Sequence, residues 1–163
     1  NENARPIFSD KTYPINKKEF LNSEILEGQT LLVFENNMTF EFSDFKEHKF
    51  KKILLVLNNT NRAIRLSEKV LKFKADLLKD QKVRLEEKSI NCEIINISDL
   101  KNIVENIYAL YPAVGENFDF IQNNNLKNIK FLYRKLDQFS WQYCNKGFFN
   151  FKNYIPKIIA KFN

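Results

Sequence analysis

The sequence contains few glycines, cysteines and histidines, and each shortage excludes a class of protein. Its 163 residues include three glycines, two cysteines and one histidine. Loops that bind phosphate through the backbone need several closely spaced glycines, and neither G-x-G-x-x-G nor G-x-x-x-x-G-K occurs. The one histidine, His48, lies in a charged connector without the apolar wall of a nucleophilic triad, so we expect it to be solvated. We therefore expect no resident metal or cofactor, and a binding protein rather than an enzyme.

Long apolar runs are also missing. The longest, residues 53–57, has the length of a strand and is far shorter than the roughly 20 residues that cross a bilayer. Cys92 and Cys144 do not have the spacing of zinc ligands, and both are expected to be small buried side chains. Unpaired thiols favour the reducing cytoplasm, although a first residue of Asn1 leaves a cleaved leader as the alternative.

Charged and aromatic residues are unevenly distributed. Residues 126–163 hold eight of the 26 Lys and Arg residues, ten aromatic residues and a single acid, Asp137. The first 125 residues are nearly neutral, so the C-terminal quarter accounts for the net charge of +6. A general bias toward Lys and Asn explains lysines throughout the chain, but not the loss of acids after residue 125. Interleaved bases and rings are typical of surfaces that meet nucleic acid, and an acidic protein surface is the other expected partner.

The hydrophobic pattern predicts a short central mixed sheet. Residues 30–34 and 38–42 flank Asn36 and Asn37, which tolerate the left-handed turn of a β-hairpin. Residues 52–57 are apolar on both faces, as expected of a strand inside a sheet. An N-terminal hairpin is therefore expected to join a sheet that contains at least one parallel pair.

Helices are expected to flank this sheet. A helix over 62–88 and a strand over 92–97 would complete a βαβ unit, and a further helix is expected over 100–110. We therefore predict a single α/β domain spanning residues 1–163, with an irregular N-terminal segment over 1–29.

Residues 126–163 are predicted to form a helical lobe packed on this domain. Apolar residues at alternating spacings of three and four predict a helix over 126–144. Gly147 is expected to end that part of the lobe, and Pro156 to lie in the first turn of a closing helix. Most of the aromatic rings are expected to pack inside.

The basic lobe carries the main candidate binding surface. Three of its bases recur at helical spacing, which would align them in a stripe able to contact phosphates, and exposed rings beside them could stack on bases. The predicted nucleic-acid or partner-binding residues are Lys127, Lys130, Arg134, Lys146, Phe148, Phe149 and Lys152.

A second candidate site follows the strand over 52–57. Ligands of open α/β sheets gather beyond the carboxyl ends of strands, where helix N-termini attract anions. The residues that would hold an anion there are Asn59, Thr60, Arg62 and Arg65. An ordinary capping turn is favoured, because no glycine lets the backbone approach a phosphate. Asp44, Glu47 and Lys49 resemble the acid-acid-lysine set of some nucleases, a combination that also arises by chance.

These patterns predict a non-catalytic binding or assembly protein whose basic aromatic lobe contacts nucleic acid or an acidic protein. One alternative is a structural subunit of a larger complex that docks through residues 148–151. The other is an enzyme-like α/β domain that binds a phosphorylated ligand through residues 58–65.

Overall fold

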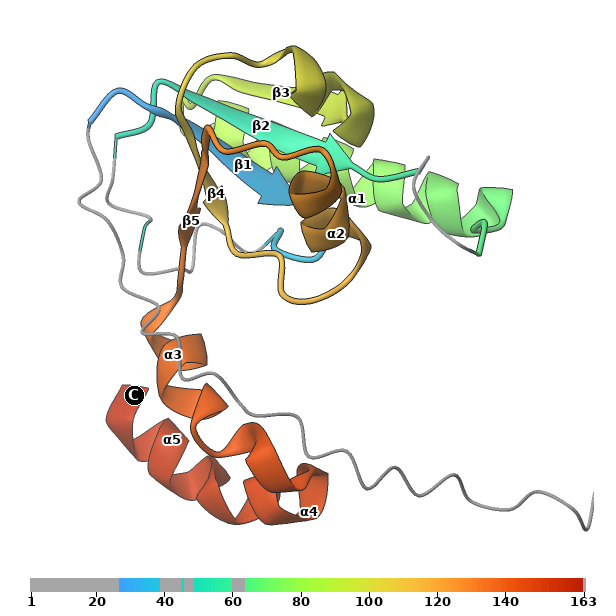
Figure 1. Cartoon of the computed structure of the whole chain (residues 1–163). Helices are drawn as coiled ribbons and strands as arrows, with labels where there is room; N and C mark the ends of the chain where they lie inside the picture. The colour runs from blue at the N-terminus through green and yellow to red at the C-terminus, as the bar shows by residue number, and fades with distance from the viewer. Residues whose placement is uncertain (1–26, 39–44, 46–48, 60–63, 163) are drawn as a thin grey trace, which may run out of the picture.

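The first strand, β1 (Thr30–Phe34), lies in the middle of the sheet, and all its side chains are buried. In the computed structural model, which describes residues 27–38, 45, 49–59 and 64–162, five strands pair in the order β3-β2-β1-β4-β5. All four pairings are parallel (Figure 1). The remaining strands are β2 (Lys52–Leu57), β3 (Cys92–Asn96), β4 (Ile107–Leu110) and β5 (Ile129–Leu132).

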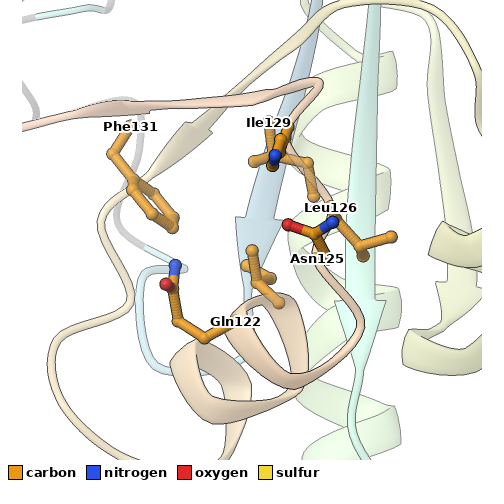
Figure 2. A pocket seen from close by; sticks show the side chains of 7 residues that line it. Gln122, Asn125, Leu126, Ile129 and Phe131 are labelled. Atoms are coloured by element: carbon orange, nitrogen blue, oxygen red, sulfur yellow. The ribbon is translucent and has the colours of Figure 1, made fainter.

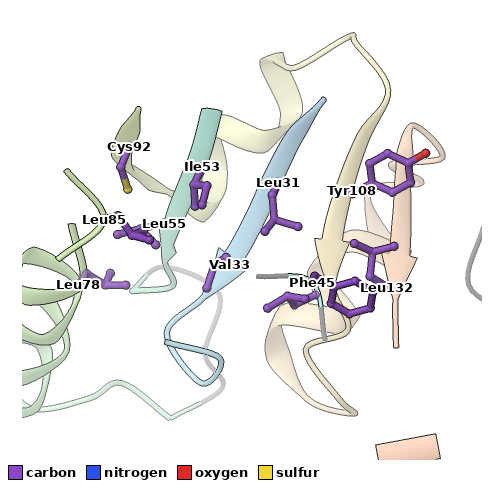
Figure 3. Close-up of a cluster of buried hydrophobic side chains, with 11 residues drawn as sticks. Leu31, Val33, Phe45, Ile53, Leu55, Leu78, Leu85, Cys92, Tyr108 and Leu132 are labelled. Atoms are coloured by element: carbon purple, nitrogen blue, oxygen red, sulfur yellow. The ribbon is translucent and has the colours of Figure 1, made fainter. Parts of the chain in front are cut away.

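Alternate side chains of β1 enter two different hydrophobic clusters. Leu31 and Val33 belong to one cluster and Leu32 and Phe34 to the other, because successive strand side chains point to opposite faces of a sheet. Figure 3 shows the first cluster, in which Phe45 from the β1–β2 connection lies beside β4 and β5. The sheet is therefore buried on both faces, which explains its nearly continuous apolar strands.

Helix α1 (Glu68–Glu86) covers β2 and β3 on the first face. Ser67 caps its N-terminus by accepting a hydrogen bond from the amide of Val70. The helix is about 28 Å long, whereas a six-residue strand spans about 20 Å. Part of the helix must therefore extend past the strands that it covers. Its buried residues, Leu78, Gln81 and Leu85, all lie in its second half.

The short 3₁₀ helix η2 (Ile97–Asn102) and helix α2 (Glu116–Asn123) pack on the opposite face, as their buried residues in the second cluster show. The chain moves outward from β1 to β2 and β3, then crosses back to β4 and β5 on the other side of β1. This order places α1 and α2 on opposite faces, as right-handed connections require. The chain therefore proceeds across the sheet in one direction from β1 and in the opposite direction from β4. We call the end of this strand pair the winding reversal.

A helical lobe follows β5 and extends beyond the sheet (Figure 1). It consists of α3 (Lys135–Trp141), η3 (Cys144–Lys146), α4 (Phe148–Phe151), η4 (Lys152–Tyr154) and α5 (Ile155–Phe162). Gly147 joins η3 to α4 with a φ of +77°, a conformation that suits glycine. The closing helix containing Pro156 in its first turn is as predicted.

The predicted α/β class, with a central sheet and flanking helices, is confirmed, but the expected hairpin is wrong. Both edges of β1 are occupied by parallel partners, so β1 has no edge left for an antiparallel hairpin partner. Met38 is not in a strand, and residues 39–42 lie outside the described part of the chain. The sheet is therefore parallel throughout the described strands rather than mixed.

Three helix predictions also need correction. The helix expected over 62–88 begins only at Glu68, after Ser67. Residues 100–110 contain the end of η2 and strand β4, and residues 126–144 contain strand β5 before helix α3 begins. Each of these strands is a short apolar run that is hydrogen-bonded to a neighbouring strand. The spacing of apolar residues within the run does not reveal that pairing.

The two cysteines have different environments. Cys92 is buried beside Leu85, whereas Cys144 is exposed, so the expectation of two buried thiols holds only for Cys92. Burial, with a smaller contribution from Glu86, raises the pKa of the Cys92 thiol from 9.0 to about 11. The thiol of the unfolded chain ionises at a lower pH than the buried thiol of the folded protein. The free energy of unfolding therefore falls as the pH rises from 9.0 to about 11.

Truncation of a valine in the centre of the sheet is expected to destabilise the fold. Val33→Ala removes two methyl groups from a side chain with no exposed surface, and should lower the free energy of unfolding by about 2 kcal/mol. The matched control, Val104→Ala, alters a side chain that is 93% exposed and should change little. Urea unfolding measures both, and equal effects would contradict the placement of β1.

Thiol reactivity should separate the two cysteines. At pH 8 a disulfide reagent is expected to modify Cys144 in the native protein and Cys92 only after unfolding, because the buried thiol remains protonated. Cys144→Ser should abolish the fast reaction, and Cys92→Ser should leave it unchanged. Rapid modification of the native Cys144→Ser protein would contradict the burial of Cys92.

Candidate functional site

An aromatic cluster joins the lobe to the sheet. Tyr111, directly after β4, packs edge-to-face on Trp141 of α3 with ring centroids 5.7 Å apart, and its centroid lies 5.0 Å from that of Tyr133. Phe118 and Phe131 extend the cluster. Burial raises the pKa of Tyr111 and of Tyr133 above the ordinary value of 10.0, so both phenols are neutral at physiological pH. These partly buried rings pack α3 against the sheet.

Arg134 also belongs to this junction. Its guanidinium donates a hydrogen bond to Oδ1 of the buried Asn37, whose Nδ2 donates to the Tyr111 carbonyl at 3.1 Å. Its Nε lies 3.8 Å from a carboxylate oxygen of Asp137. Arg134, predicted to bind a partner, thus connects the segments that follow β1, β4 and β5. Its contacts are those of a structural residue.

Inside the lobe, rings and lysine stems pack on one another. Tyr143 and Tyr154 stack with centroids 4.4 Å apart, and Phe139 contacts Phe162 edge-to-face. Lys157 and Lys161 lie over the rings of Tyr143 and Phe139 at 5.4 and 4.2 Å from their centroids. Within residues 135–162, all of which are described, Ile158 is the one buried hydrophobic side chain. Most rings of the lobe do pack against one another, as expected, but they are only partly buried and do not form a deep core.

Two predicted rings point away from this packing. Phe148 and Phe149 at the start of α4 are 66% and 84% exposed, and their centroids lie 5.8 Å apart in an edge-to-face arrangement. Lys146 precedes them and Lys152 follows them, both exposed. Among the described residues, no carboxylate forms an ion pair with either lysine. The structure thus brings four predicted binding residues together at one end of the lobe, and we call Lys146, Phe148, Phe149 and Lys152 the α4 surface.

Lys127 and Lys130 do not join this surface. Lys127 precedes β5 and Lys130 lies within it, level with Tyr108 of β4, whereas the lobe follows the other end of that strand (Figure 1). Because this segment is a strand, the predicted helical stripe of Lys127, Lys130 and Arg134 does not form. Of the three residues, Lys130 alone lies within β5, and Lys127 and Arg134 belong to the segments before and after the strand.

The predicted anion site after β2 remains a prediction. Thr60 and Arg62 lie outside the described residues, and Asn59 and Arg65 are exposed. Helix α1 begins only after Ser67, so its N-terminus does not directly follow β2. His48, Asp44 and Glu47 also lie outside the described part of the chain.

A crevice that the sequence pattern did not predict lies between the segments following β1 and β4. It has a volume of about 240 Å³. Its lining residues are Glu35, Asn36, Lys74, Pro112, Val114, Gly115, Glu116 and Asn117. The sequence signal for it is the run of polar residues immediately after a buried strand. The other wall is the segment after β4, and the sequence pattern predicts a helix rather than a strand before that segment. This crevice is at the winding reversal, where ligands of open α/β sheets commonly bind.

A smaller hollow of about 130 Å³ lies between α2 and β5 (Figure 2). Its walls include the amide side chains of Gln122 and Asn125 and the apolar side chains of Leu126, Ile129 and Phe131. This hollow contains no charged group other than Lys127. In the described part of the chain, no three His, Cys, Asp or Glu side chains are arranged to hold a metal ion.

Removal of the Arg134 side chain should weaken the junction. Arg134→Ala leaves the buried Asn37 oxygen without its donor, which should lower the free energy of unfolding by about 1–3 kcal/mol. The exposed Arg65 is the matched control, since Arg65→Ala removes the same side chain from the surface. Denaturant unfolding of both variants tests this, and an unchanged midpoint for Arg134→Ala would contradict its structural role.

Comparisons of the chain with protein-family models, curated proteins and solved structures find no match. Across the described residues, no helix combines the length and apolar character needed to span a membrane. Any function assigned to this chain therefore rests on its own residues.

Proposed function

We propose that this protein is a non-catalytic binding module whose C-terminal lobe holds single-stranded nucleic acid through the α4 surface. The observation that carries the proposal is the exposure of Phe148 and Phe149 between two lysines that have no carboxylate partner among the described residues. The surrounding lobe contains one acid, Asp137, which lies beside Arg134.

The exposed rings support a contact surface because the lobe does not need them for its own packing. A fully buried phenylalanine contributes about 1.5–3 kcal/mol relative to an exposed one, and neither ring gains most of this in the free protein. Stacking on a nucleobase contributes about 1–3 kcal/mol per base. A bound strand would therefore supply the burial that the fold itself leaves incomplete.

The lysines support an anionic ligand. Lys146 and Lys152 are separated from the body of the protein, where ion pairs such as Lys74–Glu35 and Lys51–Glu105 neutralise much of the charge. Each phosphate that a lysine neutralises releases counterions, which makes binding tighter and dependent on salt. Charge and rings together favour a ligand that offers phosphates and flat bases alternately.

An acidic protein surface is less well matched to this arrangement. Carboxylates would satisfy the lysines, but an acidic chain presents no regular series of π faces to Phe148 and Phe149. The same rings support a second candidate function, a subunit that docks them into an apolar pocket of a larger complex. That function requires a stoichiometric protein partner whose binding depends on the rings and only weakly on salt.

Binding of a labelled single-stranded oligonucleotide of about 12 nucleotides, followed by fluorescence anisotropy, tests the proposal. Phe148→Ala with Phe149→Ala should weaken binding by about tenfold or more, because stacking is lost. Lys146→Glu with Lys152→Glu should weaken it further and reduce the slope of log K against log salt by about 1.4, since two phosphate contacts disappear.

Matched controls come from helix α1 and the turn that follows it. Phe73 is 63% exposed, so Phe73→Ala removes an exposed ring elsewhere. Lys72→Glu with Lys88→Glu makes the same change in net charge at exposed positions. Both controls should bind as the wild type does. Equal losses in the controls, or equally tight binding of polyglutamate, would overturn nucleic-acid recognition by the α4 surface.

A further inference from the structure

The crevice at the winding reversal contains a connected polar network. The Lys74 Nζ lies 2.8 Å from Glu35 Oε1, and Asn117 Nδ2 donates to Glu35 Oε2 at 3.4 Å. Asn58 Nδ2 donates to Asn117 Oδ1 at 2.9 Å, and Asn58 has no exposed surface. Lys74 from α1 and Asn117 from α2 thus hold the Glu35 carboxylate directly, and Asn58 after β2 supports Asn117. The Glu35 side chain is only 6% exposed.

Stability alone does not account for this network. Replacement of a buried ion pair by apolar residues is often neutral or stabilising, so such pairs are weak evidence of a purely structural role. Lys74 comes from the half of α1 that extends past the sheet, where Val70 and Phe73 are exposed. That half of the helix contributes little burial, yet it supplies the cation that fixes Glu35.

The adjoining backbone is also specialised. Asn36 Nδ2 donates to the Pro112 carbonyl at 2.8 Å and ties the two walls together. Gly115, at the start of α2, has a φ of +133° and a ψ of −168°, a region that is essentially restricted to glycine. No atom lies within 4 Å of the position that a Cβ would occupy there. Glycine is therefore favoured at this point of the wall by its backbone conformation rather than by a lack of space.

The charges of the lining indicate the class of ligand. Among the described lining residues, the one cation, Lys74, is paired with Glu35, so the crevice does not favour an anion. A carboxylate has about four lone-pair sites, and Lys74 and Asn117 use one on each oxygen of Glu35. Two neighbouring hydroxyl groups can donate to the two oxygens of one carboxylate. The volume of about 240 Å³ is below the usual 300–1,000 Å³ of drug-sized sites.

We propose that this crevice binds a small neutral molecule with vicinal hydroxyl groups, such as a free pentose or the ribose of a nucleoside, through the Glu35 carboxylate. Lys74 and Asn117 position that carboxylate, and the segment from Pro112 to Gly115 forms the facing wall. This site is on the sheet rather than on the α4 surface, and its existence does not depend on nucleic-acid binding by the lobe.

Calorimetric titration of the full chain with D-ribose, adenosine, 2′-deoxyadenosine and inorganic phosphate tests this proposal. Adenosine or ribose should bind, and the comparison between them separates a nucleoside from a free sugar as the source of the hydroxyls. The 2′-deoxy compound should bind about tenfold or more weakly than adenosine, because one hydrogen bond to a charged acceptor is lost. Phosphate should not bind.

Glu35→Gln retains the shape of the side chain and removes its charge, and should abolish binding. Because this leaves Lys74 unpaired, the double variant Glu35→Gln with Lys74→Gln provides a second test that removes both charges together. Glu93→Gln, at an exposed carboxylate on β3, is the matched control and should bind as the wild type does. Circular dichroism establishes that each variant is folded.

Four results would overturn the proposal. These are no binding of either ribose or adenosine, equal affinity for adenosine and its 2′-deoxy analogue, tight binding of phosphate, and full affinity in a folded double variant. Loss of the α4 surface by Phe148→Ala with Phe149→Ala should leave the titrations unchanged, so the two proposals fail independently.

Discussion

β1 is hydrogen-bonded along both edges and packed on both faces, and the positions of the other elements depend on it. Its side chains alternate between the two hydrophobic clusters, and its partners β2 and β4 begin the two halves of the sheet. The three residues that follow it are polar and bond to both halves. Glu35 pairs with Lys74, Asn36 donates to the Pro112 carbonyl, and Asn37 bonds to the Tyr111 carbonyl and to Arg134. The crevice and the junction of the lobe are therefore built from consecutive residues at one strand end.

The fold class was predictable because some segments carry local signals that tertiary contacts reinforce. Residues 52–57 are apolar on both faces and lie inside the sheet, and the strand over 92–97 was placed within one residue of β3. Residues 107–110 and 129–132 were assigned to helices, since a four-residue apolar run fits either period. These segments form strands because they pair with strands that are distant in sequence. A local pattern of apolar residues does not show which distant segments will pair.

The candidate sites were predictable to different degrees. Composition alone located the bases and rings of the C-terminal quarter, and Lys146, Phe148, Phe149 and Lys152 do lie together there. Lys127 does not join the α4 surface, because the segment that follows it is the strand β5 rather than a helix. The crevice could not be predicted in this way, because Glu35 and Asn117 are 82 residues apart and meet only through the β1–β4 pairing.

The aromatic junction has a practical consequence. Trp141 is the single tryptophan of the chain, and it lies between Tyr111 and Tyr133 where the lobe meets the sheet. Its ultraviolet emission is thus an intrinsic optical reporter of that contact. Water reaching the indole would shift the spectrum to longer wavelengths, so undocking of the lobe can be followed in real time without a label and separately from unfolding of the sheet.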